Sequence, residues 1–277
     1  MYTLNCKGQP IDLTIPKIMG IINVTPDSFY DGGRTTVLRD CIAQAEKMVR
    51  HGATFLDIGG YSSRPGAKEV SETEEQARVI PVLEALEREF PTTFLSIDTF
   101  RSTTAKHAVD AGASLVNDIS GGMLDAEMLT TVAKLKVPYI LMHMKGTPET
   151  MGSLAEYKNI TKEVLYYFSE RIALARKAGI NDIIADPGFG FAKTRKHNFE
   201  VLKHLELFKA LDVPLLIGIS RKSLIYKTLD TTPNEALNGT TVLNSIALQK
   251  GASILRVHDV KEAKECVTLL QSVYNTD

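Results

Sequence analysis

The sequence has few cysteines, almost no net charge and no long hydrophobic run. Its three cysteines, Cys6, Cys41 and Cys266, are far apart and form no Cys-x-x-Cys pair. We therefore expect no disulfide framework and no zinc site, and a reducing cytoplasm fits this usage best. The formal net charge of −1 over 277 residues argues against broad electrostatic capture of nucleic acid. We also expect neither a membrane span nor a signal peptide, because no apolar segment has the required length. These observations predict a soluble protein in which a local basic cluster could still bind a small anion.

A short pattern recurs along the chain, in which a glycine precedes a compact apolar strand that ends in polar or small residues. The glycine follows a helical pattern each time, at the place where a helix C′ residue is expected. The four copies are GATFLDIGG (52–60), GASLVNDISGG (112–122), GINDIIADPGFG (179–190) and GASILRVHD (251–259). Four further strands lack the glycine, namely IMGII (18–22), FLSID (94–98), PYILMH (138–143) and LLIGI (215–219).

Eight strands that are each followed by a helix predict a (β/α)₈ TIM barrel, and 277 residues is close to the usual length. The strands are nearly continuous apolar runs, as in a parallel sheet covered by helices. The first fifteen or so residues predict a short β-hairpin that closes the bottom of the barrel. No linker-like segment divides the chain, so we expect one domain over 1–277. A doubly wound sheet is the alternative, but no G-x-G-x-x-G follows an early strand.

Local signals mark several helix ends. Ser71–Glu74 and Thr232–Glu235 each have the form of a capping box, the second with a proline at the first helical position. Pro81 falls inside a helical pattern, so we expect a kink or break there.

Polar residues follow the expected strands at the end where a barrel carries its active site. Asp57 before two glycines is typical of a turn, and Asp118 of a loop brace. A lone Asp at such a place is also a common helix N-cap. Polar residues at all eight strand ends nevertheless favour a functional face. The full set is Asn23, Asp57, Asp98, Asn117 and Asp118, His143, Asp186, Ser220 to Lys222, and Arg256 to Asp259.

These residues divide into two groups. Amide, hydroxyl and cationic groups come from strands 1, 2 and 8, which are neighbours in a closed barrel, and suit an oxyanion such as diphosphate. Acceptors from strands 3, 4 and 6 suit a planar ligand rich in N–H donors, such as an aminopyrimidinone, and Lys222 could donate to a carbonyl of that ring. The first group is Asn23, Ser63, Arg64, Arg256 and His258, and the second is Asp98, Asn117 and Asp186.

The chain resembles the dihydropteroate synthase family over essentially its whole length. Eight stretches carry the resemblance in order: MGIINVTPDSFYDGG (19–33), DIGGYSSRPGA (57–67), IDTFRS (97–102), VNDISGG (116–122), LMHMKGTPETM (141–151), DPGFGFAKT (186–194), GISRKS (218–223) and RVHDV (256–260). The resemblance implies a homodimeric barrel enzyme of folate synthesis, a target of sulfonamides. Its reaction joins 6-hydroxymethyl-7,8-dihydropterin diphosphate to p-aminobenzoate and releases diphosphate.

The resemblance also implies roles for individual residues. Asp98, Asn117, Asp186 and Lys222 would hold the pterin, with Met142 and Phe191 as apolar walls. Asn23, Ser63, Arg64, Arg256 and His258 would hold the diphosphate, with Mg²⁺ bridging it to Asn23. Phe29, Pro65, Lys222 and Ser223 would form the p-aminobenzoate pocket, over which loops 24–36 and 60–70 close. Asp98, Asp186, Lys222 and Asn23 would be the residues closest to the chemistry.

Two residues depart from the family pattern, because Tyr61 and Ser63 stand where Glu and Thr are common. Ser63 keeps the hydroxyl, whereas Tyr61 removes a carboxylate, and both could alter affinity for p-aminobenzoate or sulfonamides. Two alternatives stay open. One is a methyltransferase that acts on methyltetrahydrofolate, and the other is a pterin-binding relative that has lost activity.

Overall fold

The computed structural model describes residues 2–24, 33–61 and 70–274, with side chains in the second range from residue 36 onward. Eight parallel strands form one sheet in the order β8-β7-β6-β5-β4-β3-β10-β9, and a parallel bridge between Ala185 and Leu215 joins its two edges. The sheet therefore closes into a barrel, as the sequence predicts. The strands are β3 (Lys17–Asn23), β4 (Phe55–Gly59), β5 (Phe94–Asp98), β6 (Leu115–Asp118), β7 (Tyr139–Met142), β8 (Ile183–Asp186), β9 (Leu216–Ile217) and β10 (Ile254–Val257).

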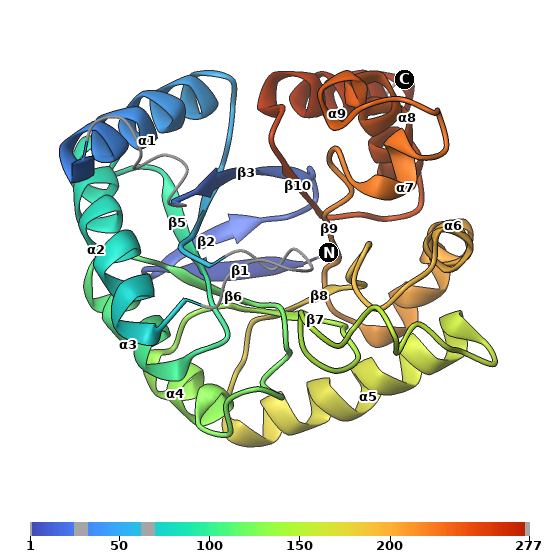
Figure 1. Cartoon of the computed structure of the whole chain (residues 1–277), viewed down its shortest axis with the longest axis horizontal. Coiled ribbons are helices and arrows are strands. Elements are labelled where there is room, and N and C mark those ends of the chain that lie inside the picture. The colour runs from blue at the N-terminus through green and yellow to red at the C-terminus, as the bar shows by residue number, and fades with distance from the viewer. Residues whose placement is uncertain (1, 25–32, 62–69, 275–277) are drawn as a thin grey trace.

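Helices surround the strands in a ring (Figure 1). The long helices that follow the strands are α1 (Gly33–Arg50), α2 (Glu72–Glu89), α3 (Ser102–Asp110), α4 (Met128–Leu135), α5 (Ile160–Ala178), α6 (Arg195–Lys203), α8 (Leu237–Gln249) and α9 (Val260–Tyr274). Shorter pieces are α7 (Ser223–Tyr226) and the 3₁₀ segments η2 (Leu205–Leu211) and η3 (Pro233–Glu235). Within the described ranges, no helix is both long enough and apolar enough to cross a membrane.

The expected helix ends are mostly confirmed. Gly179 caps α5 in the left-handed region, at φ 101°, where a glycine meets no steric penalty. Thr232 and Glu235 form the expected reciprocal capping box. Ser71 caps α2 by accepting from the Glu74 N–H, but the Glu74 carboxylate pairs with Arg78. The α2 capping box is therefore only half formed.

The expected break at Pro81 is wrong, because α2 continues from Glu72 to Glu89 with Pro81 inside it. Pro81 lacks the N–H that would bond the carbonyl of Ala77 one turn earlier. Both residues lie on the exposed face of the helix, where water can satisfy that carbonyl. The opposite face carries Val79 and Leu83, which are fully buried and hold the helix against the barrel.

The hairpin of β1 (Thr3–Cys6) and β2 (Gln9–Asp12) closes one end of the barrel, as predicted. Its apolar side chains, including Leu4 and Ile11, pack in one cluster with an apolar residue from almost every barrel strand. These strand residues are Met19, Phe55, Leu115, Ile140, Ile184, Leu216 and Ile254, with Phe94 of β5 beside them. They form the lowest layer of the barrel interior.

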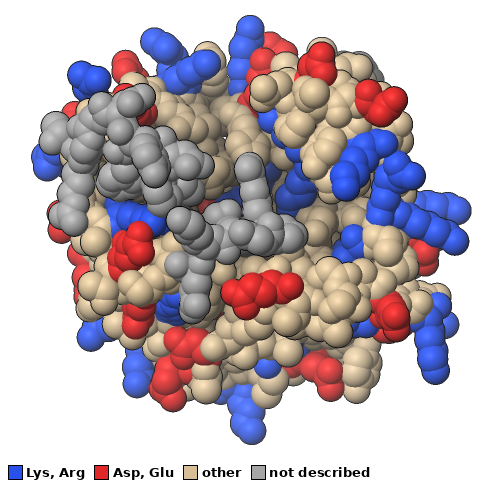
Figure 2. All heavy atoms as spheres, viewed as in Figure 1, with Lys and Arg blue, Asp and Glu red and all other residues tan. Residues whose placement is uncertain are grey.

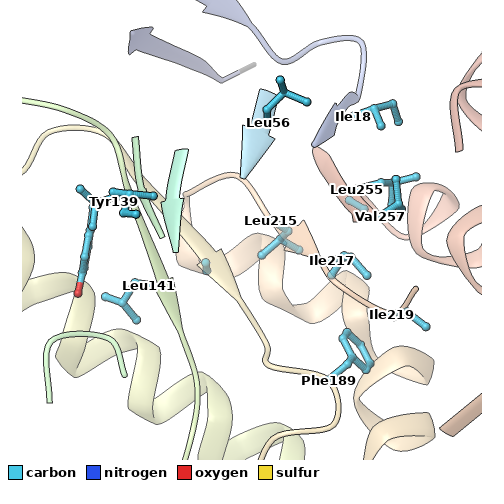
Figure 3. Packing of buried hydrophobic residues seen from close by; sticks show 14 of the residues in the cluster. Ile18, Leu56, Tyr139, Leu141, Phe189, Leu215, Ile217, Ile219, Leu255 and Val257 are labelled. Atoms are coloured by element: carbon cyan, nitrogen blue, oxygen red, sulfur yellow. The ribbon is translucent and has the colours of Figure 1, made fainter. Parts of the chain in front are cut away.

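The alternation of side chains along a strand places the next interior residue two positions further on. Above Phe55, Leu115 and Ile254 this rule gives Asp57, Asn117 and Arg256. The interior is therefore apolar near the hairpin and polar toward the carboxyl ends of the strands. The intervening residues, such as Leu56, Val116 and Leu255, point outward and belong to the core under the helices. Figure 3 shows members of this outer core from several strands.

Candidate active site

The barrel opens at the carboxyl ends of its strands into a cavity of about 700 Å³. Figure 2 shows Lys and Arg side chains in the hollow at the centre of this face. Every described residue to which the sequence assigns a site role lines this cavity: Asn23, Asp98, Asn117, Met142, Asp186, Phe191, Lys222, Ser223, Arg256 and His258. The remaining four, Phe29, Ser63, Arg64 and Pro65, lie outside the described residues.

Arg256 connects the two predicted groups of residues. Its Nη2 donates to Oδ2 of Asp98 at 2.7 Å, and its Nε donates to Oδ2 of Asp57 at 2.6 Å. The guanidinium thus lies between β4 and β5 although it comes from β10 on the other side of β3. The side chain is 17% exposed, so one edge of a largely desolvated cation faces the cavity.

Asp57 is fully buried, and it accepts from Arg256 and from Nδ2 of Asn117 at 2.9 Å. Its other oxygen, Oδ1, is buried without a hydrogen-bond partner among the described residues. The interpretation of Asp57 as a turn former is therefore wrong: the residue points into the barrel and orients two site residues. Its position two residues after Phe55 in a buried strand is the signal that could have identified it. Asp118, by contrast, braces a loop as expected, by accepting from Ser120 and Gly122.

The acceptors of the site have perturbed ionisation. Burial raises the pKa of Asp98 to about 7, although the Arg256 cation opposes this shift. Burial also raises the pKa of Asp186, where the Lys222 cation opposes it. Oδ1 of Asp186 accepts from the Gly188 N–H at 2.8 Å, which fixes the carboxylate at the start of the loop after β8. Two desolvated carboxylates in one cavity are suited to bind a ligand that brings N–H donors.

Lys222 follows β9 and contacts the loop after the neighbouring strand β8. Its Nζ donates to the carbonyl of Phe189 at 2.6 Å and lies 4.8 Å from the centre of the Phe191 ring. Burial lowers the pKa of Lys222 to about 8, and the Asp186 carboxylate limits the shift. Lys222 is therefore a cation of the cavity that an incoming carbonyl oxygen can recruit.

Arg221 has a different environment from Lys222. Its guanidinium pairs with both oxygens of Asp259, at 2.8 and 2.9 Å, and it donates to the carbonyls of Pro233 and Asn234. Arg221 contributes to the cavity wall, but its charge is already matched. Of the two basic residues after β9, Arg221 therefore has a structural role, whereas Lys222 faces the cavity.

His258 is held as a neutral imidazole. Burial lowers its pKa to about 4, and Arg256 acts in the same direction. Its Nδ1 lies 3.0 Å from Oγ of Ser220, which also accepts from the backbone N–H of His258 at 3.2 Å. A Ser220 hydroxyl that donates to Nδ1 places the hydrogen of the neutral ring on Nε2. Nε2–H is then available to an anion in the cavity.

Tyr61, the departure from the family pattern, lies against Phe100 with ring centres 5.3 Å apart and the planes nearly perpendicular. The guanidinium of Arg101 lies 4.9 Å from the Phe100 ring and 5.8 Å from the Tyr61 ring. Arg101 also pairs with the buried Glu75 and donates to the carbonyl of Val70 at 2.6 Å. An aromatic and cationic cluster therefore occupies the place of the carboxylate common in the family.

A second hollow of about 510 Å³ lies on the outer surface beside α5. It is lined by exposed and paired side chains, among them Tyr166 and the Lys145–Glu163 ion pair. The cavity inside the barrel differs because buried carboxylates and cations from many strands converge in it. That convergence is the ordinary property of a small-molecule site.

The fold and this cavity together define a barrel enzyme with its active site at the carboxyl ends of the strands. The sequence matches the family of pterin binding enzymes over residues 19–258. It is 42% identical to the dihydropteroate synthase of Escherichia coli strain K12 over 271 residues, which are 97% of this chain and 95% of that protein. The chain belongs to this family of pterin-binding enzymes, and within it to the dihydropteroate synthases.

Solved structures agree with this assignment. Dihydropteroate synthase from Xanthomonas albilineans with 4-aminobenzoic acid has a TM-score of 0.93 and 40% identity, with 99% of each chain covered. The same enzyme in complex with 7,8-dihydropteroate has a TM-score of 0.90 and 37% identity, with each chain covered completely.

Proposed function

We propose that the chain condenses 6-hydroxymethyl-7,8-dihydropterin diphosphate with p-aminobenzoate to give 7,8-dihydropteroate and diphosphate. The observation that carries the proposal is the convergence of Asp98, Asn117 and Asp186 in the cavity, with the Lys222 cation beside Asp186. The family supports the reaction, as do relatives solved with 4-aminobenzoic acid and with 7,8-dihydropteroate.

The pterin occupies the deeper part of the cavity in this proposal. Its N–H groups donate to Asp98, Asn117 and Asp186, and its ring carbonyl accepts from Lys222. Met142, which is 3% exposed, and Phe191 supply apolar surface for the ring. Burial of the carboxylates gives the site selectivity, because a ligand without these donors would leave them unpaired.

The diphosphate lies nearer the mouth, between Asn23 and the groups of β10. Arg256 and the Nε2–H of His258 donate to it, and Ser63 and Arg64 act from the adjoining loop. When Arg256 engages the diphosphate, Asp57 keeps the guanidinium in place from its buried side. The same cation therefore contacts the leaving group and borders the Asp98 carboxylate.

The residues also fit a magnesium ion bound together with the diphosphate. Asn23 ends β3 with an exposed amide at the cavity, and its oxygen is a ligand type that Mg²⁺ accepts. No group of three His, Cys, Asp or Glu side chains in the described parts of the chain could hold a metal by itself. Most ligands of the ion would thus be substrate oxygens and water. A bound Mg²⁺ supplies charge neutralisation of the diphosphate.

The reaction proceeds by departure of the diphosphate from the pterin methylene. Arg256 and His258 stabilise the charge that develops on the leaving oxygens as the C–O bond lengthens. Positive character grows on the methylene carbon and its ring, and the Asp98 and Asp186 carboxylates favour it electrostatically. The neutral amine of p-aminobenzoate attacks the carbon and then loses a proton. A strong base is not required, and Lys222 orients the ring without covalent participation.

p-Aminobenzoate is placed beside Lys222 and Ser223, at the start of α7, with Phe29 and Pro65 as further walls. We also propose that the whole chain forms one domain, that it assembles as a homodimer, and that it acts in the cytoplasm. The two alternatives, a methyltransferase and an inactive pterin-binding protein, predict different outcomes when the condensation assay is run beside a pterin-binding titration and an incubation with methyltetrahydrofolate.

The assay incubates the protein with the pterin diphosphate and Mg²⁺, with and without p-aminobenzoate, and measures dihydropteroate and diphosphate. Dihydropteroate that depends on p-aminobenzoate is the expected result. Pterin binding without product would leave the inactive relative, and methyl transfer from methyltetrahydrofolate would favour the methyltransferase. Asp186→Asn is the matched variant, because it keeps the size of the side chain and removes the charge.

A further inference from the structure

Lys193 is a buried lysine outside the set of residues that line the cavity. It follows the loop after β8 and is 9% exposed, which is unusual for lysine. Its Nζ lies 2.8 Å from Nδ1 of His143, 3.0 Å from the carbonyl oxygens of Gly188 and Phe191, and 3.4 Å from the His143 carbonyl. We call these four acceptors the Lys193 cage.

The Lys193 cage fits an ammonium ion. An ammonium carries three N–H donors, and the three nearest acceptors of the cage take one each. A neutral amine could instead donate to the two carbonyls and accept from an Nδ1–H of His143, so the charged form is part of the proposal, and comparing n-propylammonium with 1-propanol tests it. Burial lowers the pKa of Lys193, while the Asp186 carboxylate opposes that shift. Burial and the Lys193 charge also lower the pKa of His143, which keeps the ring neutral, and its Nε2–H tautomer is the one in which Nδ1 accepts from Lys193.

The cage determines the path of the loop after β8. Two of the cage carbonyls belong to Gly188 and Phe191, on either side of Phe189. The Phe189 carbonyl accepts from the Nζ of Lys222, and the Phe191 ring lies 4.8 Å from that same Lys222 Nζ. Ala192, directly before Lys193, has a φ of +46°. A non-glycine residue there costs about 1–2 kcal/mol, so the loop needs tertiary contacts to keep this shape.

We propose that Lys193 is a positioning residue, a built-in cation that holds the loop carbonyls so that Phe189 and Phe191 present Lys222 to the pterin. The inference rests on the proposed function, since it assigns Lys193 to the pterin part of that site. A nucleophilic role is excluded by position, because the ammonium is enclosed by the cage. A packing role alone would require only the four-carbon stem. It would not account for the three acceptors at 2.8 to 3.0 Å from Nζ.

The test replaces Lys193 by alanine and supplies the lost atoms as n-propylammonium, which matches the side chain from Cγ to Nζ. We expect the Kd for 6-hydroxymethylpterin to rise about tenfold or more in Lys193→Ala, and tens of millimolar n-propylammonium to recover most of it. 1-Propanol, which has a similar shape and no charge, should recover little. Lys196→Ala on the exposed side of α6 is the matched control and should bind pterin like the wild type.

A split between substrates gives the second readout. At saturating pterin diphosphate, we expect the KM for p-aminobenzoate to change less than the pterin Kd, because Ser223 and α7 lie outside the cage and only Lys222 borders both substrates. Equal recovery by 1-propanol, or an unchanged pterin Kd in Lys193→Ala, would overturn the inference. If Lys193→Ala does not fold, Lys193→Met keeps the stem without the charge, and wild-type pterin affinity in that variant would overturn it equally. A wild type without turnover would instead contradict the proposed function and, with it, the role assigned here.

Discussion

Arg256 donates to Asp98 across two strands, at 2.7 Å, and so places a cation against a carboxylate that burial makes hard to ionise. The Arg256 cation favours the ionised form of Asp98, and the Asp98 carboxylate favours the protonated form of Arg256. The pair lies where the proposed pterin and diphosphate subsites meet, so its removal should affect binding more than folding.

For Asp98→Asn we expect kcat/KM for the pterin diphosphate to fall about 10- to 100-fold, the value of a hydrogen bond to a charged group at ~1.5–3 kcal/mol. The folded-state pKa is raised to about 7, above that of an unfolded carboxyl, so above pH 7 the ionised Asp98 costs folding free energy. The variant should therefore be no less stable than the wild type in urea unfolding at pH 8. A large loss of stability would contradict this account.

The buried pair between Arg256 and Asp57 should matter for folding. Asp98→Asn keeps an amide oxygen beside Arg256, whereas Asp57→Ala removes the buried acceptor of both Arg256 and Asn117 and should lower the free energy of unfolding by about 3 kcal/mol. Glu265→Ala is the control, because it removes an exposed pair with Lys261 at 3.8 Å and should change stability by less than about 0.5 kcal/mol. Denaturant unfolding measures both. Equal effects would refute the structural role of Asp57.

Lys222 predicts an alkaline limit on pterin binding. Its pKa is lowered to about 8, and only the protonated amine can donate to the ring carbonyl in the proposed complex. Pterin affinity should rise as Asp98 ionises around pH 7, and above pH 8 the loss of the Lys222 proton should lower it about tenfold per pH unit, toward the affinity of the uncharged form. Calorimetric titration from pH 6.5 to 9.5 tests this. Lys222→Arg should bind more weakly but lose the alkaline limit, because arginine stays protonated.

Gly188 has no space for a side chain. Its φ is +69°, and an added Cβ would lie 2.1 Å from the carbonyl oxygen of His143, which is backbone and cannot yield. Gly188→Ala should therefore displace the loop after β8, lower stability by more than about 2 kcal/mol, and weaken pterin binding.

Gly8 in the hairpin turn is the matched control for Gly188. It has a similar φ of +77°, but an added Cβ would meet no atom within 4 Å. Gly8→Ala should cost only the strain of a left-handed alanine, about 1–2 kcal/mol, with activity unchanged. If both variants lose activity alike, the close approach to His143 is not the cause.

The hairpin should contribute stability without contributing to catalysis. Leu4 is 1% exposed and packs in the lowest layer of the barrel, at the end opposite the cavity. Leu4→Ala should lower the free energy of unfolding by about 2–4 kcal/mol and leave kcat and both KM values unchanged below the melting transition. A specific loss of pterin affinity would show that the two ends of the barrel are coupled.

The sequence predicted the barrel, the hairpin and the placement of the described candidate residues, because strand alternation and strand ends are strong local signals. It misjudged Asp57, since an aspartate before two glycines has the form of a turn. It also could not separate Arg221 from Lys222. Arg221 has a φ of +54°, and its acceptors come from Asp259 and from the η3 region, which are distant in sequence. Lys193 was missed for a related reason, because backbone carbonyls that converge in space leave no pattern in the residue letters.

The hairpin that closes the barrel affects how substrates enter the site and how the product leaves it. The hairpin and the apolar layer above it fill one end of the barrel, so ligands enter and leave through the opening at the carboxyl ends of the strands. A p-aminobenzoate that arrived first beside Ser223 would obstruct the route to Asp98 and Asp186. On the proposed placement of the two substrates, we expect the pterin to bind first and its ring to be the last part of the product to leave.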